Sequence, residues 1–174
     1  CKAAVGFLQE LRKMLGCDDS KGFMQTKWDG APSIVCGKDP ANGLFFVGTK
    51  SVFNTTEPKI CYSEADVDKF DYKGDLAEKL KMSLKYFMNV GIEGVIQGDL
   101  MYTKSTVKTE TIHGEKLYTF RPNTITYGIP VDHEIGKKIK ASQIGVVFHT
   151  HYTGEQKGYN SVSYTHLRAH ETRT

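Results

Sequence analysis

Apolar residues recur every three or four positions in two stretches of the chain, the spacing of one helix face. The first stretch predicts an amphipathic helix over residues 3 to 15, which ends at Gly16 and carries Val5, Leu8, Leu11 and Leu15 on one face. A helical region over residues 63 to 90 contains the second, formed by Leu76, Leu80, Leu84, Phe87 and Met88. Ser63 is the predicted cap of a short helix there, and Asp75 with Glu78 resembles a capping box for the longer one. We expect the second stripe to face the core.

Short apolar runs separated by turn residues predict strands in the rest of the chain. We expect the first strand over residues 23 to 27, a tight turn at Asp29-Gly30, a return strand over 33 to 37 and a third over 44 to 49. Later strands are expected over 94 to 102, 117 to 120, 124 to 129 and 144 to 150, with a helical turn over 134 to 140. Segregated helices and antiparallel strands predict an α+β fold with antiparallel sheets and flanking helices.

The composition fits one globular domain and excludes a membrane span. The chain has 174 residues, of which 25% are charged, and its net charge of +3 is too small to indicate nucleic-acid binding. No apolar run approaches the roughly 18 to 20 residues that cross a bilayer. The cysteines are scattered, which predicts free thiols in a reducing compartment.

Both ends of the sequence are unusual. The chain begins with Cys1 inside a helical pattern, so we expect the natural start to lie upstream. Residues 161–174 show no sustained strand or helix period and resemble a translated sequencing-adapter tail at the end of a metagenomic reading frame. We therefore assign residues 1–160 to the domain and interpret 161–174 as a non-native tail.

The run Lys27-Trp28-Asp29-Gly30 carries the most specific chemistry. A lysine at a strand end has a fixed Cα, and its amine can reach into a cleft. It becomes a nucleophile when it loses its proton, which burial or a neighbouring cation favours. Lys50 and Lys59 are candidates for that cation.

This run resembles the first motif, K-x-D-G, of the covalent nucleotidyltransferases: ATP-dependent DNA ligases, RNA ligases and capping enzymes. The resemblance implies a truncated ligase-type adenylation domain, with Lys27 as the catalytic nucleophile that attacks the α-phosphate of ATP. Further motifs agree in order over residues 20 to 155. They imply a nucleotide site made by Asp29, Gly30, Lys50 (in Gly-Thr-Lys-Ser), Asp99 (in Gln-Gly-Asp-Leu), Phe148 and His149. In that site Lys50 contacts phosphate, Asp99 lies at the ribose or metal side, Phe148 stacks on the purine and His149 hydrogen-bonds the nucleotide.

Within this superfamily, the sequence motifs most resemble those of uncharacterised ligase-like proteins of large tailed bacteriophages. Ala31-Pro32 replaces the arginine that DNA ligases carry after the glycine, which favours the RNA-ligase type. Asp99 stands for a glutamate of the family, and His149 for an aspartate. The family's E-G and K-x-K motifs are expected beyond residue 155, so we expect the 174-residue chain to be inactive by itself.

The resemblance implies a polynucleotide ligase-like enzyme that forms lysyl-AMP and passes the AMP to a nucleic-acid 5′-phosphate, with ATP and Mg²⁺ as cofactors. No metal ligand is assigned to the chain's own side chains, and a phage protein of this kind is expected in the bacterial host cytoplasm. The alternatives are a non-catalytic module that binds a nucleotide or nucleic-acid end, and a phage structural protein. Lys137, Lys138 and Lys140 are either a solvated face or a contact for a nucleic-acid backbone.

Overall fold

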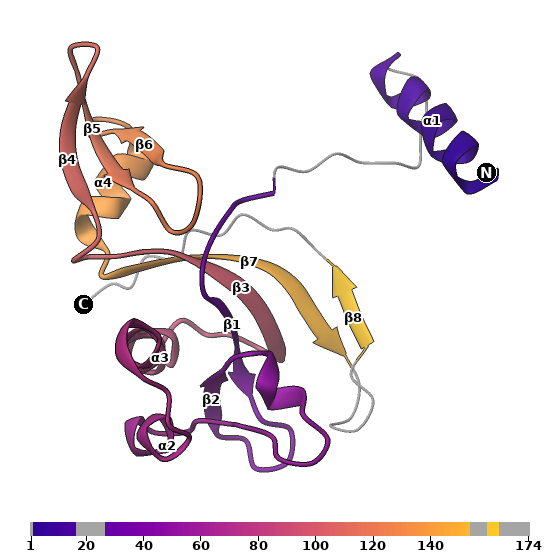
Figure 1. Cartoon of the computed structure of the whole chain (residues 1–174), viewed down its shortest axis with the longest axis vertical. Coiled ribbons are helices and arrows are strands. Elements are labelled where there is room, and N and C mark those ends of the chain that lie inside the picture. The colour runs from indigo at the N-terminus through magenta and orange to yellow at the C-terminus, as the bar shows by residue number, and fades with distance from the viewer. Residues whose placement is uncertain (1, 17–26, 154–159, 164–174) are drawn as a thin grey trace.

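Two antiparallel sheets and four α-helices make up the part of the chain that the computed structural model describes, residues 2–16, 27–153 and 160–163 (Figure 1). The helices are α1 (Lys2–Leu15), α2 (Glu64–Lys69), α3 (Gly74–Phe87) and α4 (Glu134–Ala141), with a 3₁₀ helix η1 (Lys50–Phe53). The strands are β1 (Ser33–Lys38), β2 (Phe45–Gly48), β3 (Val95–Thr103), β4 (Lys108–Ile112), β5 (Glu115–Phe120), β6 (Tyr127–Pro130), β7 (Ile144–Thr153) and β8 (Asn160–Ser163).

The larger sheet has five strands in the order β2-β1-β3-β7-β8, and α2 and α3 lie on one of its faces (Figure 1). The apolar stripe of α3 meets the strands there: Leu80, Leu84 and Phe87 are buried with Ile34 of β1 and Leu100 of β3. Each helix residue of the stripe is three or four positions from the next, so one face of α3 covers the sheet.

The smaller sheet has the order β4-β5-β6 and is packed against α4. Met101 of β3, Phe120 of β5 and Ile139 of α4 form its buried centre. β3 therefore contributes to both cores: Leu100 faces the α3 side, and Met101 faces the smaller sheet. Because successive side chains of a strand point to opposite faces, one strand can join the two layers.

The predicted α+β class with antiparallel sheets and flanking helices is confirmed, as are the helices at the chain start and over residues 63 to 90. Ser63 caps α2 as predicted, in a capping box with Asp66. The predicted capping box of α3 is wrong: its N-cap is Lys73, which makes no side-chain cap hydrogen bond. The sequence pattern also missed η1 and β4. All five residues of β4 are exposed, so this strand has no apolar alternation to detect.

The predicted hairpin turn at Asp29-Gly30 is wrong. No turn is assigned there; instead the chain bends at Ala31 and Pro32, which are joined by a cis peptide bond, and then enters β1. The strand expected over residues 23 to 27 lies outside the described residues, apart from Lys27. Of the residues interpreted as a tail, 161 to 163 belong to β8 and pair with Thr150, His151 and Tyr152 of β7.

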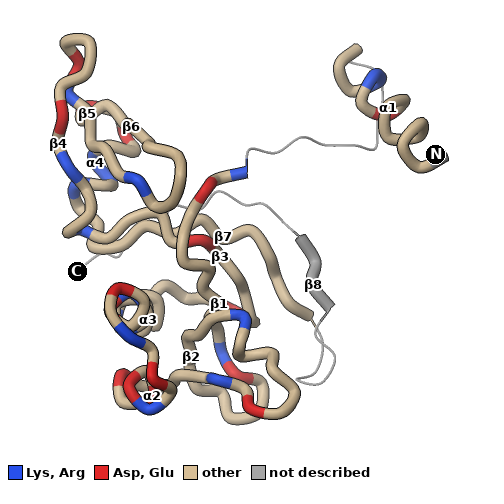
Figure 2. Tube along the Cα trace, in the orientation of Figure 1, with Lys and Arg blue, Asp and Glu red and all other residues tan. Residues whose placement is uncertain are grey.

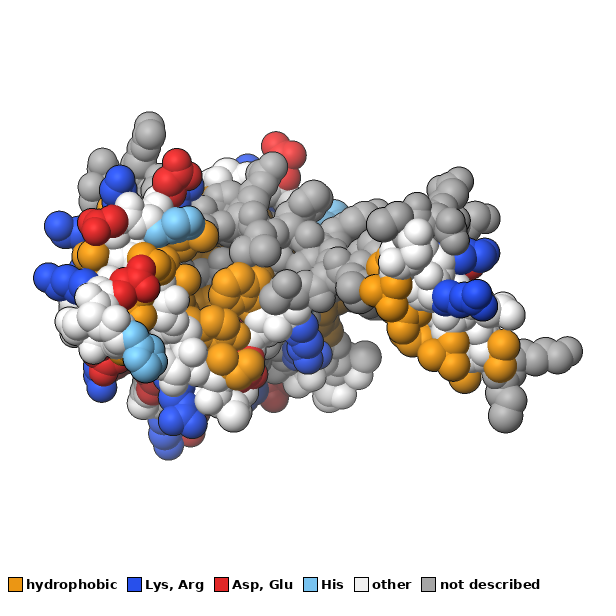
Figure 3. All heavy atoms as spheres, turned by 90° about the horizontal axis from the view of Figure 1, so that it is seen from above, with side chains coloured by type: hydrophobic (Ala, Val, Ile, Leu, Met, Phe, Trp, Pro, Cys, Tyr) orange, Lys and Arg blue, Asp and Glu red, His pale blue; other side chains and the backbone are white. Residues whose placement is uncertain are grey.

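α1 has its large apolar side chains in solvent: Val5, Phe7, Leu8 and Leu15 are each more than half exposed. Figure 3 shows apolar side chains along one edge of this helix. Among the described residues, no helix has both the length and the apolarity to cross a membrane. Cys36 and Cys61 are free thiols in the core, and burial raises the pKa of Cys61 to about 11.

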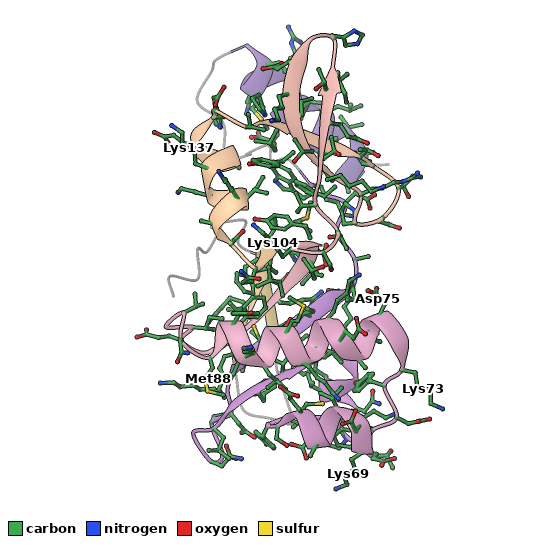
Figure 4. The ribbon with its side chains drawn as sticks, turned by 90° about the vertical axis from the view of Figure 1, so that its left-hand side faces the viewer. Lys69, Lys73, Asp75, Met88, Lys104 and Lys137 are labelled. Carbon is green, nitrogen blue, oxygen red and sulfur yellow. The ribbon has the colours of Figure 1, made fainter. Side chains whose placement is uncertain are left out.

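Leu80 and Met88 provide a matched test of this core. Leu80 is 0% exposed, whereas Met88 at the end of α3 is 53% exposed (Figure 4). We expect Leu80→Ala to lower the free energy of unfolding by about 2 to 5 kcal/mol, because it leaves a cavity. Met88→Ala should change it by less than about 0.5 kcal/mol. Urea unfolding followed by circular dichroism measures both, and equal effects would contradict the packing of α3.

Candidate functional site

The segment from Gly30 to Pro32 lies alongside β3. The Ala31 N–H donates to the Leu100 carbonyl, and the Leu100 N–H donates to the Pro32 carbonyl, each at 3.0 Å. The pairing of β1 with β3 therefore continues beyond Ser33. At Gly30 the backbone is so close that an added Cβ would lie 2.6 Å from Cβ of Asp99. Only glycine permits this approach without displacement of Asp99.

Asp29 attaches the same segment to the loop between β5 and β6. Its carboxylate accepts hydrogen bonds from Asn123 Nδ2 (2.9 Å), Thr124 N–H (2.9 Å) and Ile125 N–H (3.2 Å). Its own N–H donates to the Tyr127 hydroxyl at 2.8 Å. The hydrogen bond from Asn123, followed by that from Thr124, holds the pKa of Asp29 below its usual value. Asp29 thus orders a long-range junction rather than a local turn.

Trp28 begins a series of aromatic contacts into the smaller sheet. Its ring centroid lies 5.1 Å from that of Tyr127, which stacks on Phe120 at 5.6 Å; Phe120 in turn lies 4.9 Å from Tyr102. These contacts and the bonds of Asp29 fix the backbone directly after Lys27. Lys27 itself is exposed. Its amine is therefore attached to an anchored segment and open to solvent.

Asp99 and His149 come together on the sheet face opposite the helices. Nε2 of His149 lies 3.4 Å from Oδ1 of Asp99, and its Nδ1 lies 2.8 Å from the Thr150 hydroxyl. The β3–β7 register shifts here, since Gln97 is paired with Thr150 but Gly98 is paired with Phe148. His149 is the extra residue of this irregularity, and such bulges re-aim a side chain. The side chains of His149 and Asp99 are 31% and 19% exposed, so a ligand can reach both.

A buried polar group that was not predicted from the sequence adjoins this pair. Gln97 is 5% exposed; its amide donates to the Ser33 hydroxyl at 2.7 Å and accepts from the Tyr152 hydroxyl. A signal was available, because Gln97 and Asp99 are two positions apart on one strand and so share a face. Ser33 pairs with Asp99 across the sheet. Together these side chains form a polar strip on the face of the sheet opposite the helices.

The positions of Lys50 and Phe148 fit the predicted nucleotide site less well than those of Asp99 and His149. Lys50 is exposed and begins η1, which follows β2 at the end of the sheet where Ser33 and Asp99 pair. Lys59 lies with Nζ 5.8 Å from the ring centre of Tyr72. No hydrogen bond or ion pair within the described residues joins either lysine to Lys27. Phe148 is 9% exposed and belongs to the helix-side core, where its ring meets Phe87 edge-on. In this structure its ring is not open to a purine.

The site has two candidate metal ligands, Asp99 and His149. Among residues 2–16, 27–153 and 160–163, no group of three or more His, Cys, Asp or Glu side chains is arranged to hold a metal ion. An ion that enters with a nucleotide could still use the Asp99 carboxylate, because phosphate oxygens and water supply most Mg²⁺ ligands in such sites.

The junction at Asp29 should respond to acid. A carboxyl whose pKa is lower in the folded state stabilises the fold above its unfolded value, about 3.9, and loses this contribution as pH falls through the folded value. The Asp29 bonds should therefore be complete above about pH 4 and lost below it. The fluorescence of Trp28, the only tryptophan, reports on this.

We expect a fluorescence transition below pH 4 in the native chain, absent in Asp29→Asn. Asp75→Asn is the matched control, since the Asp75 carboxylate is exposed and forms an ion pair with Lys79 on the same helix. A transition that is the same in all three proteins would contradict the junction.

Comparison with known proteins gives a family without an assigned activity. No curated protein and no solved structure matches the chain. One family model matches residues 1–173, which is nearly the whole sequence. The chain belongs to a family of unknown function (DUF6267).

Proposed function

We propose that this chain is the adenylation part of an ATP-dependent polynucleotide ligase, with Lys27 as its nucleophile. The observation that supports this most is the meeting of three separated sequence motifs. Gly30, three residues after Lys27, lies against Asp99 of β3, and Asp99 lies beside His149 of β7. A hairpin with a solvated lysine would not require this arrangement. The resemblance of the same motifs to ligases supplies the reaction.

In the proposed first step, the unprotonated amine of Lys27 attacks the α-phosphorus of ATP. The Nζ–P bond forms, the bond from the α-phosphorus to the bridging oxygen breaks, and pyrophosphate leaves while the amine releases a proton to solvent. In the second step, a 5′-phosphate oxygen of a polynucleotide attacks the phosphorus and the Nζ–P bond breaks. A 3′-hydroxyl then displaces AMP, and the two ends are joined.

Asp99 and His149 would bind the nucleotide beside Lys27. The hydroxyl of a ribose can donate to the Asp99 carboxylate, and the exposed edge of His149 can meet a second hydroxyl or a phosphate oxygen. Mg²⁺ would enter with ATP and neutralise charge on the phosphates, as would Lys50 from the end of β2. Ala31-Pro32 in place of an arginine favours an RNA-ligase type, active in the host cytoplasm.

The burial of Phe148 supports a second candidate. If the purine has no aromatic platform, the same fold would hold a nucleotide or a nucleic-acid end without forming the covalent bond. Lys27, Asp99 and His149 would then contribute binding only. The two candidates differ in one product, a lysyl-AMP, so a single covalent assay separates them.

We expect that a longer member of this family, with E-G and K-x-K motifs after the region of residue 155, is labelled by α-³²P-ATP and Mg²⁺. The label should survive denaturation, be labile in acid and stable in base, as a phosphoramidate is. It should be lost, by more than about 100-fold, when the lysine equivalent to Lys27 is changed to alanine, because no other group supplies the nucleophile. Lys38→Ala, at the end of β1, is the control in which the label should remain.

The 174-residue chain is tested in parallel for reversible ATP binding by equilibrium dialysis. Binding without label in the longer protein would support the module, and the ligase proposal would be wrong. If neither labelling nor ATP binding is observed, both candidates are refuted.

A further inference from the structure

The charges of the described chain are unevenly divided between its two sheets. Residues 27–103 carry nine lysines and eleven acidic side chains, a net charge of −2. Residues 104–153 carry seven basic and four acidic side chains, a net charge of +3. The small net charge of the whole chain therefore hides a basic part, made by the smaller sheet and α4. Figure 2 marks basic residues on α4 and both signs of charge on α2 and α3.

The lysines of the two parts also differ in their partners. On the helix side, Lys73, Lys79 and Lys81 form ion pairs with aspartates at 3.1, 2.6 and 2.7 Å. On α4, Lys137, Lys138 and Lys140 are exposed, and no ion pair within the described residues neutralises them. The nearest acidic residues in the sequence lie before α4 (Asp132) and at its first position (Glu134), whereas Lys138 and Lys140 lie in its last turn and Lys137 directly precedes them.

Two of the three lysines, Lys138 and Lys140, lie in the last turn of α4. Cations are favourable near the carbonyl groups of a helix C-terminus. Lys104 also meets these carbonyls, since its amine donates to the Lys140 carbonyl. Figure 4 shows Lys137 projecting outward from α4, with Lys104 near the foot of the helix. The charges of Lys137, Lys138 and Lys140 thus remain available to an external anion.

α4 is also connected to the segment that carries Lys27. Ile139 of α4 is buried in the cluster of Met101 and Phe120, and Trp28 packs against that same cluster. Tyr102, next to Met101, bonds through its hydroxyl to Ser142, the C-cap of α4, at 2.9 Å. One cluster therefore fixes both the basic helix and the residue that follows the proposed nucleophile.

We infer that Lys137, Lys138 and Lys140 of α4 form a contact surface for the sugar-phosphate backbone of a polynucleotide. This inference rests on the proposed function, in which a polynucleotide end receives AMP at Lys27. A row of phosphates is the partner whose chemistry fits several unneutralised lysines on one short helix, because each contact releases a counterion from the nucleic acid. The surface positions the strand and reads no sequence.

The test measures binding of a fluorescent, 5′-phosphorylated single strand to the 174-residue chain by anisotropy, without ATP. We expect K137Q/K138Q/K140Q to weaken binding at least tenfold at low salt. The slope of log affinity against log salt should fall by about 2, because each lost phosphate contact removes about 0.7 for single strands. RNA and DNA strands are compared to identify the acceptor.

The control is K69Q/K73Q/K85Q, which removes the same charge from exposed lysines of the helix side and its flanks. Circular dichroism verifies that both variants are folded. Equal losses in the two variants, an unchanged slope in the α4 variant, or binding only to anionic lipid vesicles would overturn the inference. The binding assay omits ATP, so it tests the surface independently of the ligase reaction. If binding depends on the α4 lysines but no lysyl-AMP forms in the labelling experiment, the contact surface is supported and only the ligase proposal is refuted.

Discussion

The carboxylate of Asp29 ties the segment that leads into the larger sheet to the smaller sheet. It accepts three hydrogen bonds from the loop between β5 and β6, while the next residues pair with β3 in the larger sheet. A carboxylate with three donors is held in one orientation, and its hydrogen bonds are stronger than those of neutral acceptors. The position of Lys27, two residues earlier in the chain, depends on this junction.

The glycine after Asp29 gives this junction its second constraint. Since a Cβ at Gly30 would collide with Asp99, the backbone can lie close to β3 only with glycine there. The motif K-x-D-G then has a physical meaning in this fold. Aspartate attaches the segment to the smaller sheet, and glycine brings it against Asp99. Lysine lies directly before the segment that these two contacts fix. The bulge at His149 completes the site from β7.

The sequence predicted well what depends on apolar periodicity and poorly what depends on distant partners. α3 was found because one of its faces is buried, β1 because it is a short apolar run buried on both faces, and Ser63 because a capping box is local. The hairpin at Asp29-Gly30 was wrong because a turn dipeptide was interpreted without its partners, Asn123 to Ile125, which are more than ninety residues away. Phe148 was placed correctly on a strand, but its face could not be known without the bulge that follows it.

In the proposed function, Gly30, Asp99 and His149 form one nucleotide site beside Lys27. Backbone amide shifts of the 174-residue chain, followed by NMR while Mg²⁺-ATP is added, test it most directly. The largest shifts should occur at these three residues and at Lys27, with smaller ones at Lys50, and they should saturate together. Shifts confined to α2 and α3, or no saturable shift at Asp99 and His149, would contradict the account.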